Sequence, residues 1–468
     1  MFYTMIVSTL ILSACSPSGL SLTHIEESQL ELSEPPRETT AALLAEQQAL
    51  ENTDPEQLLA APLTAQNAIK LTLRENQDIA AELQNIGIKE ANLWQAGLLK
   101  NPIIELSTLF AEHASSANLT AALLTSLTDL WQKPLQQDIA SHDLEIEKHR
   151  IAAVLIGKAA ATHQAHLTHQ HAREQKQAAA TALQIAQARE KLTSELFKAG
   201  NITKLEHNKT ITKTHLAVKN HLLAKAHVKE TRAQLNAAMG LDGENAAQWR
   251  MARGNNRLPP LPLAEKQAEI QALTNNLGLA IAKQNLLKFA AQHQLQRQKS
   301  IIPDLDIGLE FERSDGEKEI GPLAELTIPI FDHGQAKRLK AEHQLKQLEA
   351  KLIAHMRKVA LKARTLTRKR RDQNKLLRHD KHNIIPSAKR VEQGALQHYN
   401  AMQQGAEKLL AAKQQSLELQ QDHNARRYQS WLTHIELKAL LAGHLIKEPQ
   451  TLKAQAANSK AQKDEEAH

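Results

Sequence analysis

The chain has 23 histidines, and four of them lie within one short stretch: His163, His166, His169 and His171. Steps of three along a helix bring side chains to neighbouring positions, where imidazoles could share a soft metal ion. The alternative is a polar helix face that uses histidine where glutamine also occurs. The spacing therefore makes these four residues weak candidate metal ligands and leaves both interpretations open. No cofactor is predicted.

The single cysteine, Cys15, closes the segment Leu12-Ser13-Ala14-Cys15 behind the apolar stretch from Met5 to Leu12. That stretch is too short to span a bilayer, which takes about 20 residues, and is typical of a signal-peptide core. The four residues resemble a bacterial lipobox, so we expect residues 1–14 to be removed and Cys15 to carry lipid, palmitate included. Ser16 then favours the outer membrane. The alternative is an irrelevant cysteine behind a wrongly assigned start.

Composition argues against two other classes of protein. No Gly-rich phosphate loop, nucleophile elbow or metalloprotease motif occurs, so an enzyme is not predicted. The net charge of +7 and the run Arg368-Lys369-Arg370-Arg371 could suggest a nucleic-acid patch. Lys and Arg alternate with Glu and Asp along the predicted helices, as on solvated faces. We therefore expect no nucleic-acid partner.

The chain repeats a set of landmarks at an offset of about 200 residues. Pro102 corresponds to Pro303, Phe197 to Tyr399 and Gly240 to Gly443, at offsets of 201, 202 and 203. With only 3% aromatic residues and few Gly or Pro in long segments, the composition is that of long helices. Each half is therefore expected to be one large supersecondary unit.

In the first half, a helix is predicted over 63–99 and ends before Pro102, since a residue preceding proline leaves the helical region. A strand over 103–111 and a weaker one over 119–131 follow. From Pro134 to Phe197 there is one glycine and no further proline, which predicts a helix roughly 95 Å long. Gly200 then breaks the chain, and a second helix returns over 203–239 to Gly240.

The second half follows the same plan. A helix is predicted over 263–300, and a strand follows in which Leu305, Ile307, Leu309 and Phe311 alternate with polar residues. A loop over 313–322 and a strand over 324–331 come next. Gly334 opens another helical stretch that reaches Tyr399, and Gly405 marks a second reversal before the chain returns to Gly443.

Four segments, in this order, resemble the TolC family of outer-membrane efflux channels: Lys100-Asn101-Pro102; residues 197–205 from Phe197 to Leu205; Ile328-Pro329-Ile330-Phe331-Asp332-His333-Gly334; and residues 399–410 from Tyr399 to Leu410. The similarity covers residues 63–443. It implies a mainly α fold with a small β part, in which long helical hairpins form a coiled-coil tunnel below four transmembrane strands per chain. It also implies a trimer and hairpin tips that meet a periplasmic adaptor and close the conduit at rest.

Strand length leads to the same assembly. Strands of about 9–11 residues can cross an outer membrane, but an open four-stranded sheet leaves unpaired edges in lipid. Two copies would give eight strands with a filled interior, whereas three would give a 12-stranded β-barrel with a passage. The apolar strand faces would then meet lipid, and Asp306 and Glu310 would line the pore.

The resulting hypothesis is the outer-membrane channel of a tripartite efflux system, passively exporting small molecules or metal ions from the periplasm with an inner-membrane pump and an adaptor. The expected adaptor contacts lie at the tips: Phe197, Gly200, Asn201, Thr203, Leu205, Tyr399, Gly405, Glu407 and Lys408, the last two being candidate gate or docking residues. The alternative is a periplasmic coiled-coil adaptor or spacer lipoprotein without a pore, which would need the hairpins and the lipid but not the strands.

The expected organisation has six parts: a signal peptide (1–14), a lipidated tether rich in proline and acidic residues (15–62), a first repeat (63–243), a linker (244–262), a second repeat (263–443) and a disordered tail (444–468). The tail assignment follows from its high charge and low apolar content.

Overall fold

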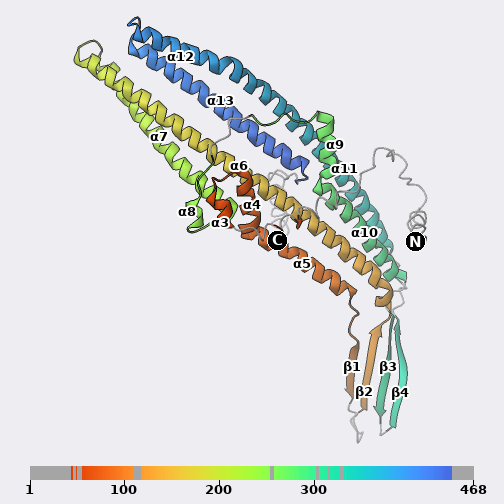
Figure 1. The fold of residues 1–468 in the computed structure, drawn as a ribbon. Coiled ribbons are helices and arrows are strands. Elements are labelled where there is room, and N and C mark those ends of the chain that lie inside the picture. Colours follow the sequence, from red (N-terminus) through yellow and green to blue (C-terminus); the bar gives the residue numbers. More distant parts are fainter. Residues whose placement is uncertain are drawn as a thin grey trace, which may run out of the picture.

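The structure is a computed structural model that describes residues 44, 45, 49, 55–109, 118–252, 258–301, 305–314, 317–326, 331 and 334–444. It is elongated, with a four-stranded sheet at one end and the tips of two long helical hairpins at the other (Figure 1). The mainly α fold with a small β part is confirmed. Cys15, the signal segment, residues 445–468 and the segment Ile328-Pro329-Ile330 lie outside the described residues.

The first half contains helices α3 (Pro55–Ala60), α4 (Ala65–Glu75) and α5 (Gln77–Gly97), strands β1 (Ile103–Leu109) and β2 (Asn118–Ser126), and then helices α6 (Thr128–Lys198) and α7 (Lys204–Met239). With 71 residues, α6 is about 105 Å long. It packs against α5, α7, α10 and α13 and is the central helix of the molecule.

A short helix, α8 (Asn245–Gln248), precedes the second half, whose elements follow in a similar order. They are helices α9 (Glu265–Asn275) and α10 (Leu277–Ile301), strands β3 (Leu305–Ser314) and β4 (Glu317–Leu326), helix α11 (Gln335–His379), a π-helical turn (Asp380–Ile384), and helices α12 (Ile385–Asn400) and α13 (Ala406–Leu441). The π turn lets α11 run on into α12.

Each predicted entry helix is broken in two by an asparagine, so the single helices expected over 63–99 and 263–300 are wrong. Asn76 accepts a bond from the Asp78 backbone N–H at 3.1 Å, and Asn276 accepts one from Leu279 N–H at 3.0 Å. Asparagine is among the best residues for this capping role. The apolar periodicity continues across both breaks and hid them.

The long helix α6 begins earlier than predicted, and β2 ends earlier. The strand expected to reach Trp131 stops at Ser126, and the helix starts at Thr128 rather than at Pro134. Thr128 Oγ1 accepts the backbone N–H of Leu305 at 2.7 Å and so ties the helix start to β3. Asp129 in the first turn favours a helix N-terminus, and Pro134 lies inside the helix.

The sheet is antiparallel, with strand order β1-β2-β3-β4 and no bulge in its register. β4 starts at Glu317, so the loop predicted over 313–322 and the strand predicted over 324–331 are wrong. Gly321 and Pro322 suggested a loop, but Pro322 is paired with Leu309. β4 is the edge strand of the single chain's sheet, a position where proline occurs in sheets.

The core lies midway along the molecule, where the short helices α4 and α9 cross the long ones. Leu63, Leu71, Leu235, Met239 and Trp249 form one fully buried cluster there. A second cluster joins α9 to α11 and α13. The two hairpins are thus fixed at mid-length, and their ends extend beyond the core.

The basic run on α11 is occupied by internal contacts. Arg368 and Arg371 form ion pairs with Glu265 at 2.8 and 3.0 Å. Arg370 is fully buried and donates to Ser430 and to the Pro260 carbonyl. These cations therefore hold α9 and its preceding segment against the second hairpin.

Among the described residues, no helix is both long and apolar enough to cross a bilayer.

Candidate functional site

The two faces of the sheet differ sharply in chemistry. Because the register is regular, side chains of one parity share a face. Ile104, Leu106, Leu123, Leu309 and Ile320 lie on one face, which is apolar and largely exposed. The other face carries the described carboxylates of the strands: Glu105, Asp306, Glu310, Glu312, Glu317, Glu319 and Glu325.

The predicted pore residues Asp306 and Glu310 both belong to this acidic face. Asp306 is directly opposite Glu325, and Glu312 is opposite Glu319. Like charges in such cross-strand positions destabilise an isolated sheet. No Lys or Arg occurs at the described positions of the acidic face. The acidic face is therefore a surface that water or counter-ions must stabilise.

The first hairpin tip joins α6 to α7 through residues 199–203. Gly200 has a φ of 73°, and the Asn201 N–H donates to Leu196 O at 2.8 Å. Thr203 and Glu206 cap α7 reciprocally in a capping box. Phe197 stacks on His207 with 5.1 Å between ring centroids, and Leu205 is exposed. The tip is thus a defined turn with apolar side chains on its surface.

The second tip has the same plan. It joins α12 to α13 through residues 401–405, a connection of the same length as that in the first tip. Met402 has a φ of 57° and takes the place of Gly200, whereas Gly405 is the N-cap residue and corresponds to Thr203. Met402 is 94% exposed and Tyr399 is also exposed.

Polar contacts link the two hairpins between the core and the tips. Arg427 of α13 donates to Glu174 of α6 at 2.8 Å. Tyr428 bonds to Thr168 at 2.9 Å and stacks on His171. Nearest the tips, Arg189 of α6 is 3.1 Å from Glu407 of α13. Glu407 is therefore part of an ion pair between the hairpins, whereas Lys408 is exposed and has no ion pair among the described residues.

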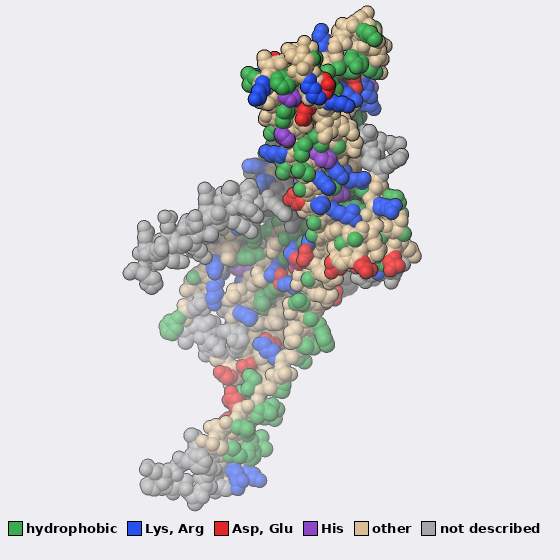
Figure 2. Space-filling model, turned by 90° about the vertical axis from the view of Figure 1, so that its left-hand side faces the viewer, with side chains coloured by type: hydrophobic (Ala, Val, Ile, Leu, Met, Phe, Trp, Pro, Cys, Tyr) green, Lys and Arg blue, Asp and Glu red, His purple; other side chains and the backbone are tan. Residues whose placement is uncertain are grey.

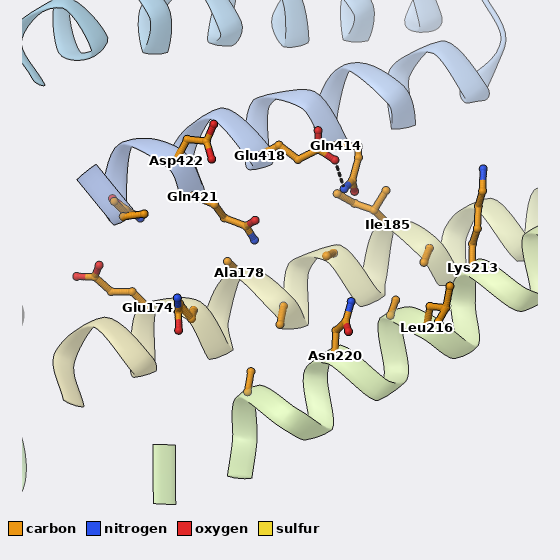
Figure 3. Close-up of a pocket in the computed structure, with 18 of the residues that line it drawn as sticks. Glu174, Ala178, Ile185, Lys213, Leu216, Asn220, Gln414, Glu418, Gln421 and Asp422 are labelled. Carbon is orange, nitrogen blue, oxygen red and sulfur yellow. Dashed lines mark hydrogen bonds between the residues drawn. The ribbon is translucent and has the colours of Figure 1, made fainter. Parts of the chain in front are cut away.

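Between these contacts lies a groove of about 790 Å³ bounded by α6, α7 and α13. Figure 3 shows Ala178 and Ile185 on its floor, Lys213 and Asn220 on the α7 side, and Glu418 on α13. Small side chains dominate α6 here and leave space between α6 and α13, so the two hairpins do not pack closely along the groove.

Three of the four candidate metal ligands on α6 have different partners. His166 bonds to Leu63 O at 3.2 Å, His169 bonds to Thr231 Oγ1 at 3.0 Å and His171 stacks on Tyr428. The pKa of His163 is lowered to about 4, chiefly by burial and then by His166. No group of three potential ligands occurs in the part of the chain that the structure describes. In this structure His166, His169 and His171 contact three different residues outside α6.

Buried neutral histidine predicts a pH effect on stability. The pKa of His169 is lowered to about 4, first by burial and then by Arg173 and Arg232, and the side chain is only 3% exposed. A histidine in the unfolded chain has a pKa near 6.5. Between these values the unfolded state binds more protons, so stability is complete above about pH 6.5 and falls as pH drops toward 4.

Between pH 7 and pH 4 we expect the free energy of unfolding to fall by less in His169→Gln than in the intact protein, with a difference on the order of 2 kcal/mol. The measurement is thermal unfolding of both proteins at the two pH values, followed by circular dichroism. His215→Gln, on exposed surface of α7, is the control. An unchanged pH dependence in His169→Gln would contradict the assignment.

Comparison with solved structures places this arrangement in a known class. The chain is similar to the CmeC outer membrane channel of Campylobacter jejuni, with a TM-score of 0.67 and 15% identity over 85% of this chain and 89% of that one. It is also similar to CusC, a protein whose crystal structures concern folding and transmembrane channel formation. The TM-score is 0.66, with 15% identity over 81% of this chain and 92% of that one. No protein-family model matches the sequence, and no curated protein does either.

The fold is thus that of the outer-membrane channels. VceC, an outer membrane protein of Vibrio cholerae, adds a third example, with a TM-score of 0.64 and 12% identity over 81% of this chain and 96% of that one. The fold of the single chain that the resemblance to the TolC family implies, long helical hairpins with a four-stranded sheet, is confirmed.

Proposed function

We propose that this chain is the outer-membrane channel of a tripartite efflux system and conducts passively from the periplasm to the exterior. The observation that carries the proposal is the sheet with one apolar and one acidic face, whose strand β2 leads into α6, a helix about 105 Å long. A spacer or adaptor would have no use for four strands sorted in this way. The proposed function involves no enzymatic activity.

The sheet edges support closure with other copies of the chain. β1 and β4 are the edge strands, and their unpaired backbone groups could not be left open in lipid. Pairing β1 of one copy with β4 of the next satisfies both edges. Three copies give a 12-stranded barrel wide enough for a passage. A homotrimer is therefore the assembly we propose.

In this assembly the apolar face meets outer-membrane lipid and the helices extend into the periplasm. The exposed tip residues, Leu205 and Met402 above all, offer apolar surface to a periplasmic adaptor. The adaptor would connect the conduit to an inner-membrane pump. Lipid on Cys15 would anchor the tether to the same membrane.

The direct test is single-channel recording of the full-length protein in planar bilayers. Deleting residues 305–326 removes β3 and β4 and provides a pore-free control. Discrete conductance steps in the intact protein and none in the control are expected. If neither protein conducts while both remain folded and helical, a spacer or adaptor function takes the place of the channel.

The ion pair between the hairpins predicts gate behaviour. Glu407→Arg would place a second cation near Arg189 and push α13 away from α6 close to the tips. Because Glu407 is 58% exposed, the stability cost should stay below about 1 kcal/mol. We expect raised resting conductance in the bilayer assay, and recovery in the double variant Arg189→Glu/Glu407→Arg.

Lys408 separates gating from docking. Lys408→Glu also reverses a charge but disrupts no described ion pair. Resting conductance should therefore remain normal, while export in cells falls if the adaptor contacts this side chain. Normal conductance in Glu407→Arg would remove its gate role, and intact export in both variants would remove the docking role as well.

A further inference from the structure

The apolar face of the sheet carries two cations at one level. Arg313 of β3 and Lys318 of β4 are directly opposite each other. Both are exposed, and they are the charged residues among the described positions of that face. In Figure 2, basic side chains (blue) lie beyond the apolar ones (green) at the end of the sheet far from the helices. Two like charges opposite each other are unfavourable unless an anion comes between them.

Charge at this end of the sheet is sorted by face. Glu312 and Glu319 are at nearly the same level but on the acidic face. A hairpin end that simply reached solvent would have no reason to place its acids on one side and its bases on the other. Neither Arg313 nor Lys318 has an ion pair within the described ranges. The sorting therefore points to different surroundings on the two faces.

The height of the apolar face sets the level of the cations. From Leu305 to Arg313 the strand rises roughly 27 Å, which becomes roughly 20 Å along the membrane normal at the usual barrel tilt. The lipid-facing band of outer-membrane barrels is about 25 Å tall. The cations consequently lie at the boundary between acyl chains and headgroups, where charge on the lipid face is tolerated.

From this position we infer that Arg313 and Lys318 form a binding site for the phosphate groups of outer-leaflet lipid. The inference rests on the proposed function, because it needs the sheet to be in a membrane with its turns outward. Arginine binds phosphate through paired N–H groups and lysine through a point charge. In the proposed trimer, three such sites would surround the barrel and fix its depth in the membrane.

The test is native mass spectrometry of the detergent-extracted full-length protein titrated with lipid A, which carries phosphate. The decisive variant is Arg313→Glu, because the new carboxylate would pair with Lys318 and favour the fold while abolishing the anion site. Arg390→Glu is the control: it makes the same change of charge, but at an exposed position on α12, far from the sheet. We expect Arg313→Glu to bind lipid A at least about tenfold more weakly and Arg390→Glu to bind it normally.

Two further arms distinguish the sources of phosphate and the possible failures. Lipid A stripped of phosphate should bind weakly, and millimolar inorganic phosphate should not displace intact lipid A. Equal binding by Arg313→Glu, or displacement by free phosphate, would overturn the inference. Bilayer conductance measured in parallel tests the channel itself: a conducting protein without selective lipid A binding keeps the proposed function and loses this site.

Discussion

Replacing Glu310, Glu312 and Glu319 together by glutamine should strongly reduce the preference of the channel for cations over anions. The three side chains share the acidic face of β3 and β4, which has no described cation to balance them. Rings of Asp and Glu select cations in channels, and a surface of one sign concentrates counter-ions by about tenfold or more. In a trimer the substitution would remove nine carboxylates, so the effect should be large.

The reversal potential under a potassium chloride gradient measures this preference. It should fall in the triple variant, although four carboxylates per chain remain on the acidic face. It should also shrink in the intact protein at 1 M salt, where screening acts over about 3 Å. The matched control is Arg313→Gln/Lys318→Gln, at a similar level of the sheet but on the apolar face. Unchanged selectivity in the triple variant would mean that the acidic face does not line the pore.

The class of fold was predictable because its strongest signals are long and periodic. Helix α6 and the alternation in β3 follow directly from sequence spacing, and the 200-residue offset predicts that the two halves are alike. The sheet face of Asp306 and Glu310 could be predicted for the same reason, since strand alternation fixes the parity of every side chain.

The errors occur where one residue decides against the pattern around it. Asn76 and Asn276 break their helices through single capping bonds, and Pro322 lies within the last strand of the chain's sheet although proline usually indicates a loop. The ion pair of Glu407 with Arg189 joins residues more than 200 positions apart, so no local pattern could reveal it. The histidine cluster shows the converse, because His166, His169 and His171 are close in sequence but contact different residues once the helices pack.

A single methyl group at Gly443 should destabilise the molecule severely. Gly443 has a φ of 103°, and a Cβ there would be 2.3 Å from Asn275 O and 3.1 Å from Leu277. Its carbonyl also accepts the Leu277 N–H at 3.2 Å, so the glycine lies directly on the break between α9 and α10. The first half repeats the arrangement, with Gly240 against Glu75 O and Asn76. Gly443→Ala combines a disfavoured backbone with overpacking, at a cost of about 2–4 kcal/mol.

Two other glycines separate the cost of the backbone conformation from the cost of overpacking. Gly200 has a φ of 73° with open space around its Cβ position, so Gly200→Ala should cost only the backbone term of about 1–2 kcal/mol. Gly87 is inside α5, also with open space, so Gly87→Ala should stabilise by roughly 0.5–1 kcal/mol. Thermal unfolding in detergent, followed by circular dichroism, should give apparent Tm values that decrease in the order Gly87→Ala, unchanged protein, Gly200→Ala and Gly443→Ala. If Gly443→Ala unfolds no earlier than Gly200→Ala, the close approach to Asn275 does not constrain the helix break. Because that contact joins the end of α13 to the entry helices, its loss should loosen the second hairpin before the first.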